Sequence, residues 1–484
     1  MKKDILIIGG GVVGCAVARL LSRFNASVAV LEAGADVAEG ASKANSGIVH
    51  AGYDAKPGSL KAKLNVEGAK AYPALCAEVD APYGRPGALV LGFSEQDRAT
   101  IGQLYEQGVQ NGVEELRILE HDEILALEPN VSPAVLCALH IPTSGLVSPY
   151  ELTCALADHA AVNGVLFSLN TVVSEIRKEE DGFILSTSQG EMQAKIVVNC
   201  AGVNSAKLHN MLSKHRLNVI PRKGEYYLLD HQKPMLFGMT LFQTPSKMGK
   251  GVLVSPTVHG NLLLGPSAID VEDGSDVSTT AEALKLVSDA VRLTWPRENL
   301  RGVVTTFAGM RAHEENGDFI IGATEGVAGA YETVGIESPG LSAAPAIAKM
   351  LVSQIAKENG LTEKAEWLPA PKREKPFCSM TTEERAEVVA RDPEYGALVC
   401  RCEQVTEAEI RAAIRRPVGA KTIDAVKRRT RAGMGRCQGG FCSPRVLEIL
   451  SEELGVDPTE VTKCGGESQL LVGTIAQAAN KGDR

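Results

Sequence analysis

Ile5-Leu6-Ile7-Ile8-Gly9-Gly10-Gly11-Val12-Val13-Gly14 is the stretch of sequence that decides the fold. Its four leading apolar residues are typical of a parallel strand that is buried on both faces. The glycines after them have the spacing Gly-x-Gly-x-x-Gly, and residues 15–21 continue as an apolar helix. In this pattern Gly9 permits a tight turn, Gly11 lets the backbone approach a pyrophosphate, and Gly14 lets the helix pack closely on the strand.

A second strand is expected at residues 27–31, and it ends at Glu32. A carboxylate at this place can hold a ribose hydroxyl, while the N-terminus of the helix faces the phosphates. Strand, glycine turn, helix, second strand and terminal glutamate together predict a dinucleotide-binding domain of the Rossmann type. The alternative is a glycine-rich turn in an α/β domain that binds nothing.

Two later segments favour FAD over NAD as the dinucleotide. The loop Ser42-Lys43-Ala44-Asn45-Ser46-Gly47 is polar and rich in small residues, which suits a large cofactor. A further strand at residues 196–200 ends in Ala201 and Gly202. No second Gly-x-Gly-x-x-Gly follows, although an enzyme that reduced its flavin with NADH would usually carry one. The electron donor is therefore expected to be a small substrate that meets the flavin directly.

Length and charge limit the other function classes. The 484 residues correspond to roughly three domains of ~150 residues each. The net charge of −9 argues against a general nucleic-acid binder, which is usually basic. No stretch reaches the ~20 apolar residues of a membrane helix, and no secretory leader is visible. A cytoplasmic protein without an integral membrane segment is expected, with peripheral membrane association through a partner as a second option.

Four of the eleven cysteines fall between residues 400 and 442, with the spacing Cys400-x-Cys402, 34 residues, then Cys437-x4-Cys442. Such clustering is typical of a metal or cluster site and not of a disulfide framework. Thiolates on loops near helix N-termini, among glycines, favour a [2Fe–2S] cluster. The alternatives are a structural zinc site and a module without metal. The other seven cysteines are expected to be small buried hydrophobes.

Two local patterns complete the cysteine region. Thr406 with Glu409 predicts a capping box, and Pro444 suits the first turn of a final helix. Five basic residues lie within ten positions, namely Lys427, Arg428, Arg429, Arg431 and Arg436. They predict a docking patch for an acidic redox partner, electrostatic support for the cluster, or a solvated helix face.

The segments Asn45-Ser46-Gly47-Ile48-Val49-His50-Ala51-Gly52-Tyr53 and Lys223-Gly224-Glu225-Tyr226-Tyr227 resemble L-2-hydroxyglutarate dehydrogenases. More broadly, residues 1 to about 360 resemble the D-amino-acid-oxidase superfamily of FAD oxidoreductases. The cysteine region resembles the bacterioferritin-associated-ferredoxin-like cluster domain. Its combination with a flavin domain is similar to that of bacterial glycerol-3-phosphate dehydrogenases of the anaerobic type.

The resemblance implies an α/β and α+β fold, in which a Rossmann-like FAD domain is interleaved with an antiparallel-sheet substrate domain. The FAD domain would comprise residues 1–80, 145–215 and 300–360. The substrate domain would comprise residues 80–145 and 215–300 and would roof the flavin. A linker at 361–395 would lead to a small helical [2Fe–2S] domain at 396–455, and a tail at 456–484 would follow.

The resemblance also implies positions in the flavin site. Val173 would lie by the adenine. The loop that holds Gly335, Gly340, Leu341 and Ser342 would close on the flavin ring, with the positive end of the following helix toward it.

For the substrate, the resemblance places His50 beside the flavin, where a base is needed, with His259 and His313 as weaker candidates. Arg311 matches the position that clamps a carboxylate or phosphate. Lys247 and Lys250 could add positive charge, although a solvated loop is the alternative. Lys223 and Tyr226 could line the roof or occupy strand positions without a ligand contact.

Together these observations predict an FAD-dependent dehydrogenase that oxidises glycerol 3-phosphate, a small anionic hydroxylated substrate, by hydride transfer to flavin N5. The alternative substrates are L-2-hydroxyglutarate, another 2-hydroxy acid, or an amino acid. Because an oxidase could discharge its flavin to oxygen without a cluster, the cluster implies an electron-acceptor protein or a quinone-linked partner. The rival from another class is a non-catalytic subunit with a vestigial flavin domain. Oligomers are compatible with the sequence.

Overall fold

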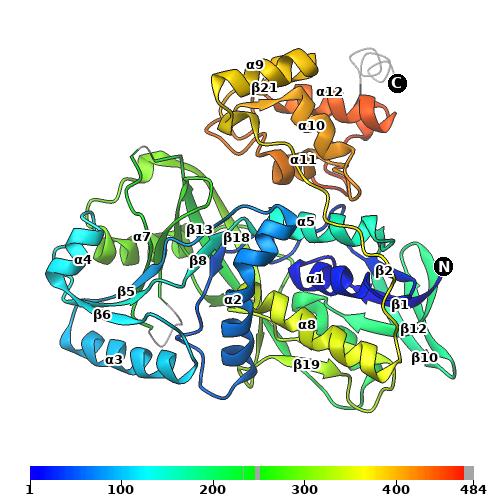
Figure 1. Cartoon of the computed structure of the whole chain (residues 1–484), viewed down its shortest axis with the longest axis horizontal. Helices are drawn as coiled ribbons and strands as arrows, with labels where there is room; N and C mark the ends of the chain where they lie inside the picture. The colour runs from blue at the N-terminus through cyan, green and yellow to red at the C-terminus, as the bar shows by residue number, and fades with distance from the viewer. Residues whose placement is uncertain (233, 246–250, 474–484) are drawn as a thin grey trace, which may run out of the picture.

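The computed structural model describes residues 1–232, 234–245 and 251–473, whose arrangement Figure 1 shows. In this part of the chain, an eight-stranded sheet has the order β10-β11-β12-β1-β2-β9, with β20 beside β12 and β19 beside β20. Its strands are β1 (Lys2–Ile8), β2 (Val28–Leu31), β9 (Leu166–Ser168), β10 (Val173–Glu179), β11 (Gly182–Thr187), β12 (Gly190–Asn199), β19 (Ile320–Ala323) and β20 (Ala330–Val334). β1 pairs in parallel with both β2 and β12, so the opening apolar run is the centre of the sheet, as predicted.

Four helices pack around this sheet, namely α1 (Val12–Leu21), α2 (Leu60–Val79), α5 (Pro149–Val162) and α8 (Gly340–Glu358). α1 contacts both α5 and α8, and α2 contacts α8. Every residue of α1 except Leu20 is buried, because neighbouring elements cover the helix on all sides. We call this sheet with its helices the nucleotide domain. Among the described residues, no helix is long and apolar enough to span a membrane.

A second, nine-stranded sheet forms a roof beside the nucleotide domain and has the order β17-β13-β16-β15-β14-β5-β7-β6 in the described chain, with β18 on the free side of β13. Its strands are β5 (Ala88–Gly92), β6 (Arg117–Glu120), β7 (Cys137–Ile141), β13 (Val219–Leu229), β14 (Thr240–Gln243), β15 (Leu253–Pro256), β16 (Leu262–Gly265), β17 (Ile269–Asp270) and β18 (Val303–Glu314). β18 pairs with β13 over most of its length, although the expected boundary at residue 300 assigned it to the nucleotide domain.

Shorter elements connect the two domains. A small sheet joins β3 (Ile48–Val49), β4 (Tyr83–Gly84) and β8 (Gly145–Val147). The helices α3 (Glu95–Gln110), α4 (His121–Leu127) and α7 (Ala281–Thr294) belong to the roof, and α6 (Ser205–Leu212) contacts β10 and β20 of the nucleotide domain. Because the chain passes repeatedly between the sheets, the segments that end strands of both domains meet along one cleft.

The C-terminal region forms a separate small domain, drawn in yellow to red above α5 in Figure 1. It comprises α9 (Thr382–Arg391), β21 (Leu398–Cys400), β22 (Val405–Thr406), α10 (Glu407–Ile414), α11 (Ile423–Thr430) and α12 (Ser443–Leu454). The predicted capping box of Thr406 and Glu409 is present at the start of α10, and Pro444 lies in the first turn of α12. Ile410, Val426 and Leu450 contribute to its own apolar core.

The segment between these domains is bound to the protein surface along its length. Trp367 lies against the guanidinium of Arg23, with Cζ 4.8 Å from the ring centre, and donates to Ser22 Oγ at 2.9 Å. Farther along, the backbone N–H of Phe377 donates to Glu409 Oε1 at 3.0 Å. Residues 361–376 are therefore a strap on the nucleotide domain, and residues 377–395 pack with the small domain, where the sequence suggested a linker.

Candidate active site and cluster site

The glycine turn after β1 has the geometry that its spacing predicted. Gly9 has a φ of +108°, and a Cβ there would lie 2.4 Å from the carbonyl oxygen of Cys200. A Cβ at Gly14 would lie 2.0 Å from the carbonyl oxygen of Gly9. Only glycine fits at either position. α1 begins after Gly11 without a side-chain cap, so the positive end of the helix faces the space above the turn.

Two polar residues shape the loop around this turn. Glu32, at the end of β2, accepts hydrogen bonds from the backbone N–H of Gly10 at 2.6 Å and of Gly34 at 2.7 Å. Burial raises the pKa of its carboxyl. Ser42 Oγ accepts from the backbone N–H of Val12 at 2.8 Å. The carboxylate and the hydroxyl thus fix the two loops that frame the N-terminus of α1.

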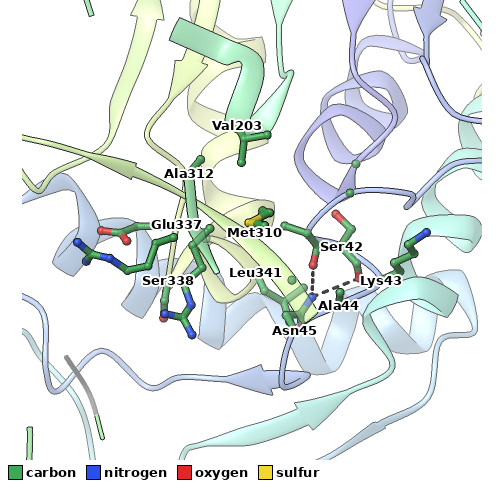
Figure 2. Close-up of a pocket in the computed structure, with 18 of the residues that line it drawn as sticks. Ser42, Lys43, Ala44, Asn45, Val203, Met310, Ala312, Glu337, Ser338 and Leu341 are labelled. Carbon is green, nitrogen blue, oxygen red and sulfur yellow. Dashed lines mark hydrogen bonds between the residues drawn. The ribbon is translucent and has the colours of Figure 1, made fainter. Parts of the chain in front are cut away.

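Asn45 shapes the next part of the same loop, and Figure 2 shows it between Ala44 and Leu341. Its side-chain amide donates to the carbonyl oxygens of Ala41 and Ser42, and its Oδ1 accepts from the backbone N–H of Gly47 at 2.8 Å. The polar loop predicted to hold a large cofactor is therefore ordered by its own side chains.

A cavity of about 1940 Å³ begins at the glycine turn and runs between the nucleotide domain and the roof. It is lined by most of the predicted site residues, namely Gly9, Gly11, Glu32, Ser42, Asn45, Ser46, His50, Val173, Ala201, Gly202, Tyr226, Arg311, Gly340, Leu341 and Ser342. Gly14, Gly47 and Gly335 lie behind this wall and do not line it. The size of the cavity and its glycine cradle fit a dinucleotide with room for a small substrate.

His50 follows β3 and is held against the start of α8. Its backbone N–H donates to Ser342 Oγ at 2.7 Å, and its ring centre lies 5.6 Å from that of Phe242 in the roof. The side chain is 7% exposed and lines the cavity. The structure thus places an imidazole at the junction of both domains, where the late loop predicted to close on the flavin also arrives.

Arg311 lies on the opposite wall. It stands directly across from Arg222 in the register of β18 and β13. Arg222 is neutralised by Asp270, whereas Arg311 donates to the carbonyl oxygen of Ser267 at 3.0 Å. Within the described residues, no carboxylate lies within ion-pair distance of Arg311. Because Asp270 neutralises Arg222, the guanidinium of Arg311 is the charge of this pair that is left to bind an anion.

An ion-pair cluster at the cavity edge was not among the predicted site residues. Lys61 Nζ lies 2.8 Å from Glu337 Oε1, which also lies 3.1 Å from His313 Nδ1. Although burial opposes it, the charge of Lys61 lowers the pKa of Glu337. Nothing in the sequence indicated that Lys61 would pair with a residue 276 positions away.

The remaining predicted side chains serve the structure. His313 and His259 do not line the cavity, and His259 Nε2 lies 2.6 Å from Glu151. Lys223 is buried and donates to Asp276 at 2.9 Å. Lys247 and Lys250 lie outside the described residues.

The four clustered cysteines line a second cavity of about 540 Å³ in the small domain. Cys402 Sγ and Cys437 Sγ lie 4.0 Å apart, and Cys442 is hydrogen-bonded to Cys400. In the described chain no three His, Cys, Asp or Glu side chains converge on one ion position. Two pairs of thiols fit a two-iron cluster, in which each iron takes two cysteines.

Hydrogen bonds to the sulfurs favour the thiolate form at Cys400 and Cys437, whereas the pKa values of their thiol partners Cys442 and Cys402 are raised. The Cys442 side chain, followed by the backbone N–H groups of Gly433 and Glu403, lowers the pKa of Cys400 to about 6. The backbone N–H of Phe441 is the main cause that lowers the pKa of Cys437. These donors suit the net negative charge of a bound cluster.

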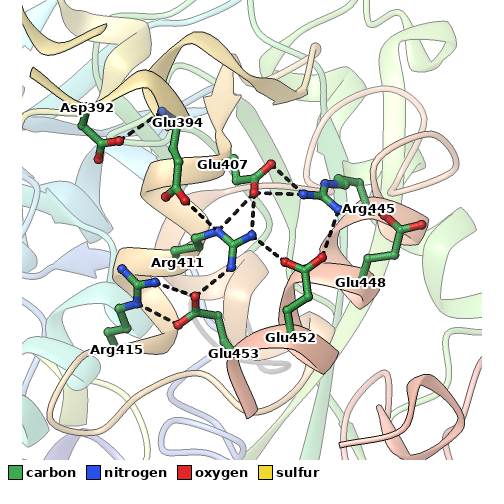
Figure 3. A network of polar contacts seen from close by, with 9 residues as sticks. All are labelled: Asp392, Glu394, Glu407, Arg411, Arg415, Arg445, Glu448, Glu452 and Glu453. Carbon is green, nitrogen blue, oxygen red and sulfur yellow. Dashed lines mark hydrogen bonds and ion pairs between the residues drawn. The ribbon is translucent and has the colours of Figure 1, made fainter. Parts of the chain in front are cut away.

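A network of charged side chains, which Figure 3 shows, adjoins the cluster cavity. Arg411 bridges Glu407 of its own helix and Glu453 of α12, the latter at 2.7 Å. Arg445 Nη2 lies 2.9 Å from Glu407, and both of these side chains line the cavity. The network thus fixes α10 against α12.

In the basic segment 427–436 of the small domain, the central arginines form neither a docking patch nor a solvated helix face. Arg428 and Arg429 both pair with Asp36 of the nucleotide domain, and their side chains are 4% and 3% exposed. Arg431 pairs with Glu403 at 2.8 Å. The docking patch and the solvated face were wrong for these three arginines because their partners come from distant parts of the chain, while electrostatic support for the cluster stays a prediction.

Comparisons with known proteins agree with this geometry. A family model described as FAD dependent oxidoreductase matches residues 4–354, and one described as BFD-like [2Fe-2S] binding domain matches residues 398–452. The chain is 47% identical to a glycerol 3-phosphate dehydrogenase of Caloramator mitchellensis over 97% of this chain and 98% of the relative. It is 31% identical to an L-2-hydroxyglutarate dehydrogenase of Indibacter alkaliphilus over 56% of this chain and 68% of the relative.

A solved structure extends the similarity to three dimensions. It is the dithionite-reduced L-alpha-glycerophosphate oxidase from Mycoplasma pneumoniae with FAD bound. The two structures superpose with a TM-score of 0.72 at 31% identity, covering 76% of this chain and 97% of that chain.

Proposed function

The chain belongs to the FAD dependent oxidoreductase family, and from this premise we propose that it oxidises glycerol 3-phosphate and passes the electrons through a [2Fe–2S] cluster to an acceptor. One observation supports an anionic substrate. Arg311 presents a guanidinium to the cavity and has no carboxylate partner in the described residues, while Arg222 across from it is neutralised by Asp270. A bidentate guanidinium suits a phosphate.

Different residues of the cavity bind the cofactor, bind the substrate and remove the proton of the alcohol. Gly9, Gly11 and the N-terminus of α1 hold the pyrophosphate of FAD, which supplies a hydride acceptor when bound. Arg311 binds the phosphate of the substrate and fixes its orientation. His50, on the opposite wall, takes the proton from the hydroxyl, because an imidazole titrates near neutral pH. Glycerol 3-phosphate is favoured by the glycerol 3-phosphate dehydrogenase that is 47% identical over 97% of this chain.

The electron acceptor that we propose is a protein or a quinone-linked carrier. Cys402 is exposed at the cluster cavity, and Phe441 beside it is 89% exposed, so the cluster site is accessible from solvent. Peripheral association with a membrane through this partner follows if the acceptor is quinone-linked.

Anaerobic flavin bleaching tests the substrate. Purified holoenzyme is mixed with glycerol 3-phosphate, L-2-hydroxyglutarate or an amino acid, and the absorbance of the oxidised flavin is followed. We expect glycerol 3-phosphate to bleach the flavin fastest. Fastest bleaching by L-2-hydroxyglutarate or an amino acid would reassign the substrate, and bleaching by none of them would contradict the function.

A further inference from the structure

We propose that electrons cross from the flavin cavity to the cluster within one chain, through the contact between Tyr150 and Met434. This inference rests on the proposed function, because it needs a flavin that gains electrons and a cluster that accepts them. It goes beyond that function by assigning the side chains at the crossing point between the two domains.

Tyr150 and Met434 meet at the wall of the large cavity. Tyr150 is the second residue of α5, and Met434 precedes Cys437 in the loop before α12. Both side chains line the cavity. Tyr150 Oη lies 3.6 Å from Met434 Sδ, so the phenol donates to the thioether. The cavity predicted to hold the flavin is thus closed on this side by a residue of the cluster domain.

On the flavin side, Tyr150 is anchored beside the polar loop 42–47. The backbone N–H of Val147, just before α5, donates to the carbonyl oxygen of Gly47 at 2.8 Å. A Cβ at Gly47 would lie 3.6 Å from Pro149 Cδ. The start of α5 is therefore in direct contact with a loop whose residues Asn45 and Ser46 line the cavity.

On the cluster side, both chain neighbours of Met434 contact cysteine ligands. The backbone N–H of Gly433 donates to the sulfur of Cys400. A Cβ at Gly435 would lie 2.3 Å from Cys402 Cβ, so the backbone there touches the cysteine directly. Met434 is thus one residue from the cluster shell in each direction, and its polarisable sulfur fills the space toward Tyr150.

The interface around this contact is fixed mainly by the buried pairs that Arg428 and Arg429 form with Asp36 of the nucleotide domain. Arg431 pairs with Glu403, next to Cys402, and donates to Asn261 Oδ1 of the roof at 3.0 Å. On the other side of Met434, Arg436 pairs with Asp230 of the roof, although the Arg436 side chain is 83% exposed. Buried charges with good partners resist separation, because breaking a pair leaves an unpaired charge out of water.

Electron balance sets the order of events. The substrate hydride delivers two electrons to the flavin, and the cluster accepts one at a time. The second electron crosses after a one-electron acceptor outside the chain has taken the first, and the substrate protons leave to solvent.

The test compares Met434→Ala with wild-type holoenzyme under anaerobic conditions, after photoreduction of the flavin with EDTA and a light pulse. Because light replaces the substrate, a wrong substrate assignment does not affect this measurement. Reduction of the cluster is followed by freeze-quench electron paramagnetic resonance. We expect Met434→Ala to slow cluster reduction by up to about 100-fold, the cost that a ~1 Å misplacement of reacting groups can reach, with flavin photoreduction unchanged.

Two further variants make the result specific. Met380→Ala removes a methionine from a separate small core of the same domain and should leave the rate unchanged. Tyr150→Phe keeps the ring, removes the hydroxyl that donates to sulfur, and should slow cluster reduction less than Met434→Ala does. Hydrogen exchange of α11 should match wild type in all three variants, which would show that the interface is intact.

Two outcomes would overturn the proposal. The first is an unchanged rate of cluster reduction in Met434→Ala with the cluster retained. The second is a rate that rises in proportion to enzyme concentration, because electrons would then pass between chains. A rate independent of concentration, together with slow transfer in Met434→Ala, supports the assigned route.

Discussion

Asp36 Oδ2 lies 2.6 Å from Nη1 of Arg429, and the two side chains are 1% and 3% exposed. This pair joins the loop after β2 to α11, and Arg428 binds the same carboxylate at 2.8 Å. Although burial opposes it, the charge of Arg429 lowers the pKa of Asp36. One carboxylate therefore holds two guanidinium groups between the nucleotide domain and the cluster domain.

Replacing Asp36 with asparagine should destabilise this interface. The substitution leaves Arg428 and Arg429 buried without their shared anion, and breaking a buried pair costs about 3–5 kcal/mol. We expect α11 to lose hydrogen-exchange protection before the nucleotide domain does. Mass spectrometry of exchanging peptides measures this order directly.

A matched substitution separates this effect from a general loss of charge. Glu114 pairs with Lys70 at 2.7 Å on the surface, where both side chains are more than half exposed. Glu114→Gln should change exchange in α11 by no measurable amount, since surface pairs contribute about 0–1 kcal/mol. Equal protection of α11 in both variants would show that Asp36 does not hold the domains together.

Glu151 gives a prediction about pH. Its carboxylate pairs with Arg373 of the strap at 2.9 Å and with His259 of the roof. Although burial opposes it, the hydrogen bond and charge of His259 and the charge of Arg373 lower its pKa from 4.5 to about 2. Because its pKa is lower in the folded state than in the unfolded state, the ionised carboxylate of Glu151 stabilises the protein above pH 4.5. This stabilisation is lost as the pH falls toward 2.

Glu151→Gln should therefore be less stable than wild type at neutral pH. The difference in urea midpoint should stay constant down to about pH 4.5 and shrink below it, because the unfolded wild type then takes up a proton. Glu114→Gln should show a much smaller convergence, because the pair of Glu114 with Lys70 is exposed to solvent. A midpoint difference that grows as the pH falls would contradict the role assigned to Glu151.

The local parts of the fold could be predicted from the sequence because their causes are local. A Cβ at Gly9 or Gly14 would clash with the crowded backbone of the turn, so only glycine fits there. The spacing of these glycines along the chain is visible in the sequence. The capping box joins Thr406 and Glu409, which are three positions apart, and is equally visible in the sequence. These elements follow from steric limits and hydrogen bonds between close neighbours.

The interface could not be predicted, because its partners are remote in the chain. Arg428 and Asp36 are 392 positions apart, and a run of basic residues looks the same whether it faces solvent or a buried carboxylate. The same holds for β18, whose pairing with β13 put Arg311 in the roof sheet. Which sheet a strand joins depends on tertiary packing and not on its own pattern.

Cys437→Ser tests the cluster ligands. Cys437 lines the cluster cavity and lies 4.0 Å from Cys402. Its loss should reduce iron from about two per chain to near zero and abolish the visible absorbance of the cluster. Cys464→Ser is the matched control, because that thiol is exposed and lies outside the cavity. One zinc per chain in a colourless wild-type protein would exclude the iron cluster.

Arg311→Lys tests the anion site. A lysine keeps the charge but loses the fork that binds two phosphate oxygens, and a charge-assisted hydrogen bond contributes about 1.5–3 kcal/mol. We therefore expect kcat/KM for glycerol 3-phosphate to fall by about 10- to 100-fold, mainly through a higher KM. Steady-state kinetics with an artificial acceptor measure both constants. Arg301→Lys makes the same exchange at an exposed position just before β18 and should leave them unchanged. If KM is the same in Arg311→Lys and wild type, the phosphate binds elsewhere in the cavity, and the uncompensated guanidinium of Arg311 serves the roof sheet alone.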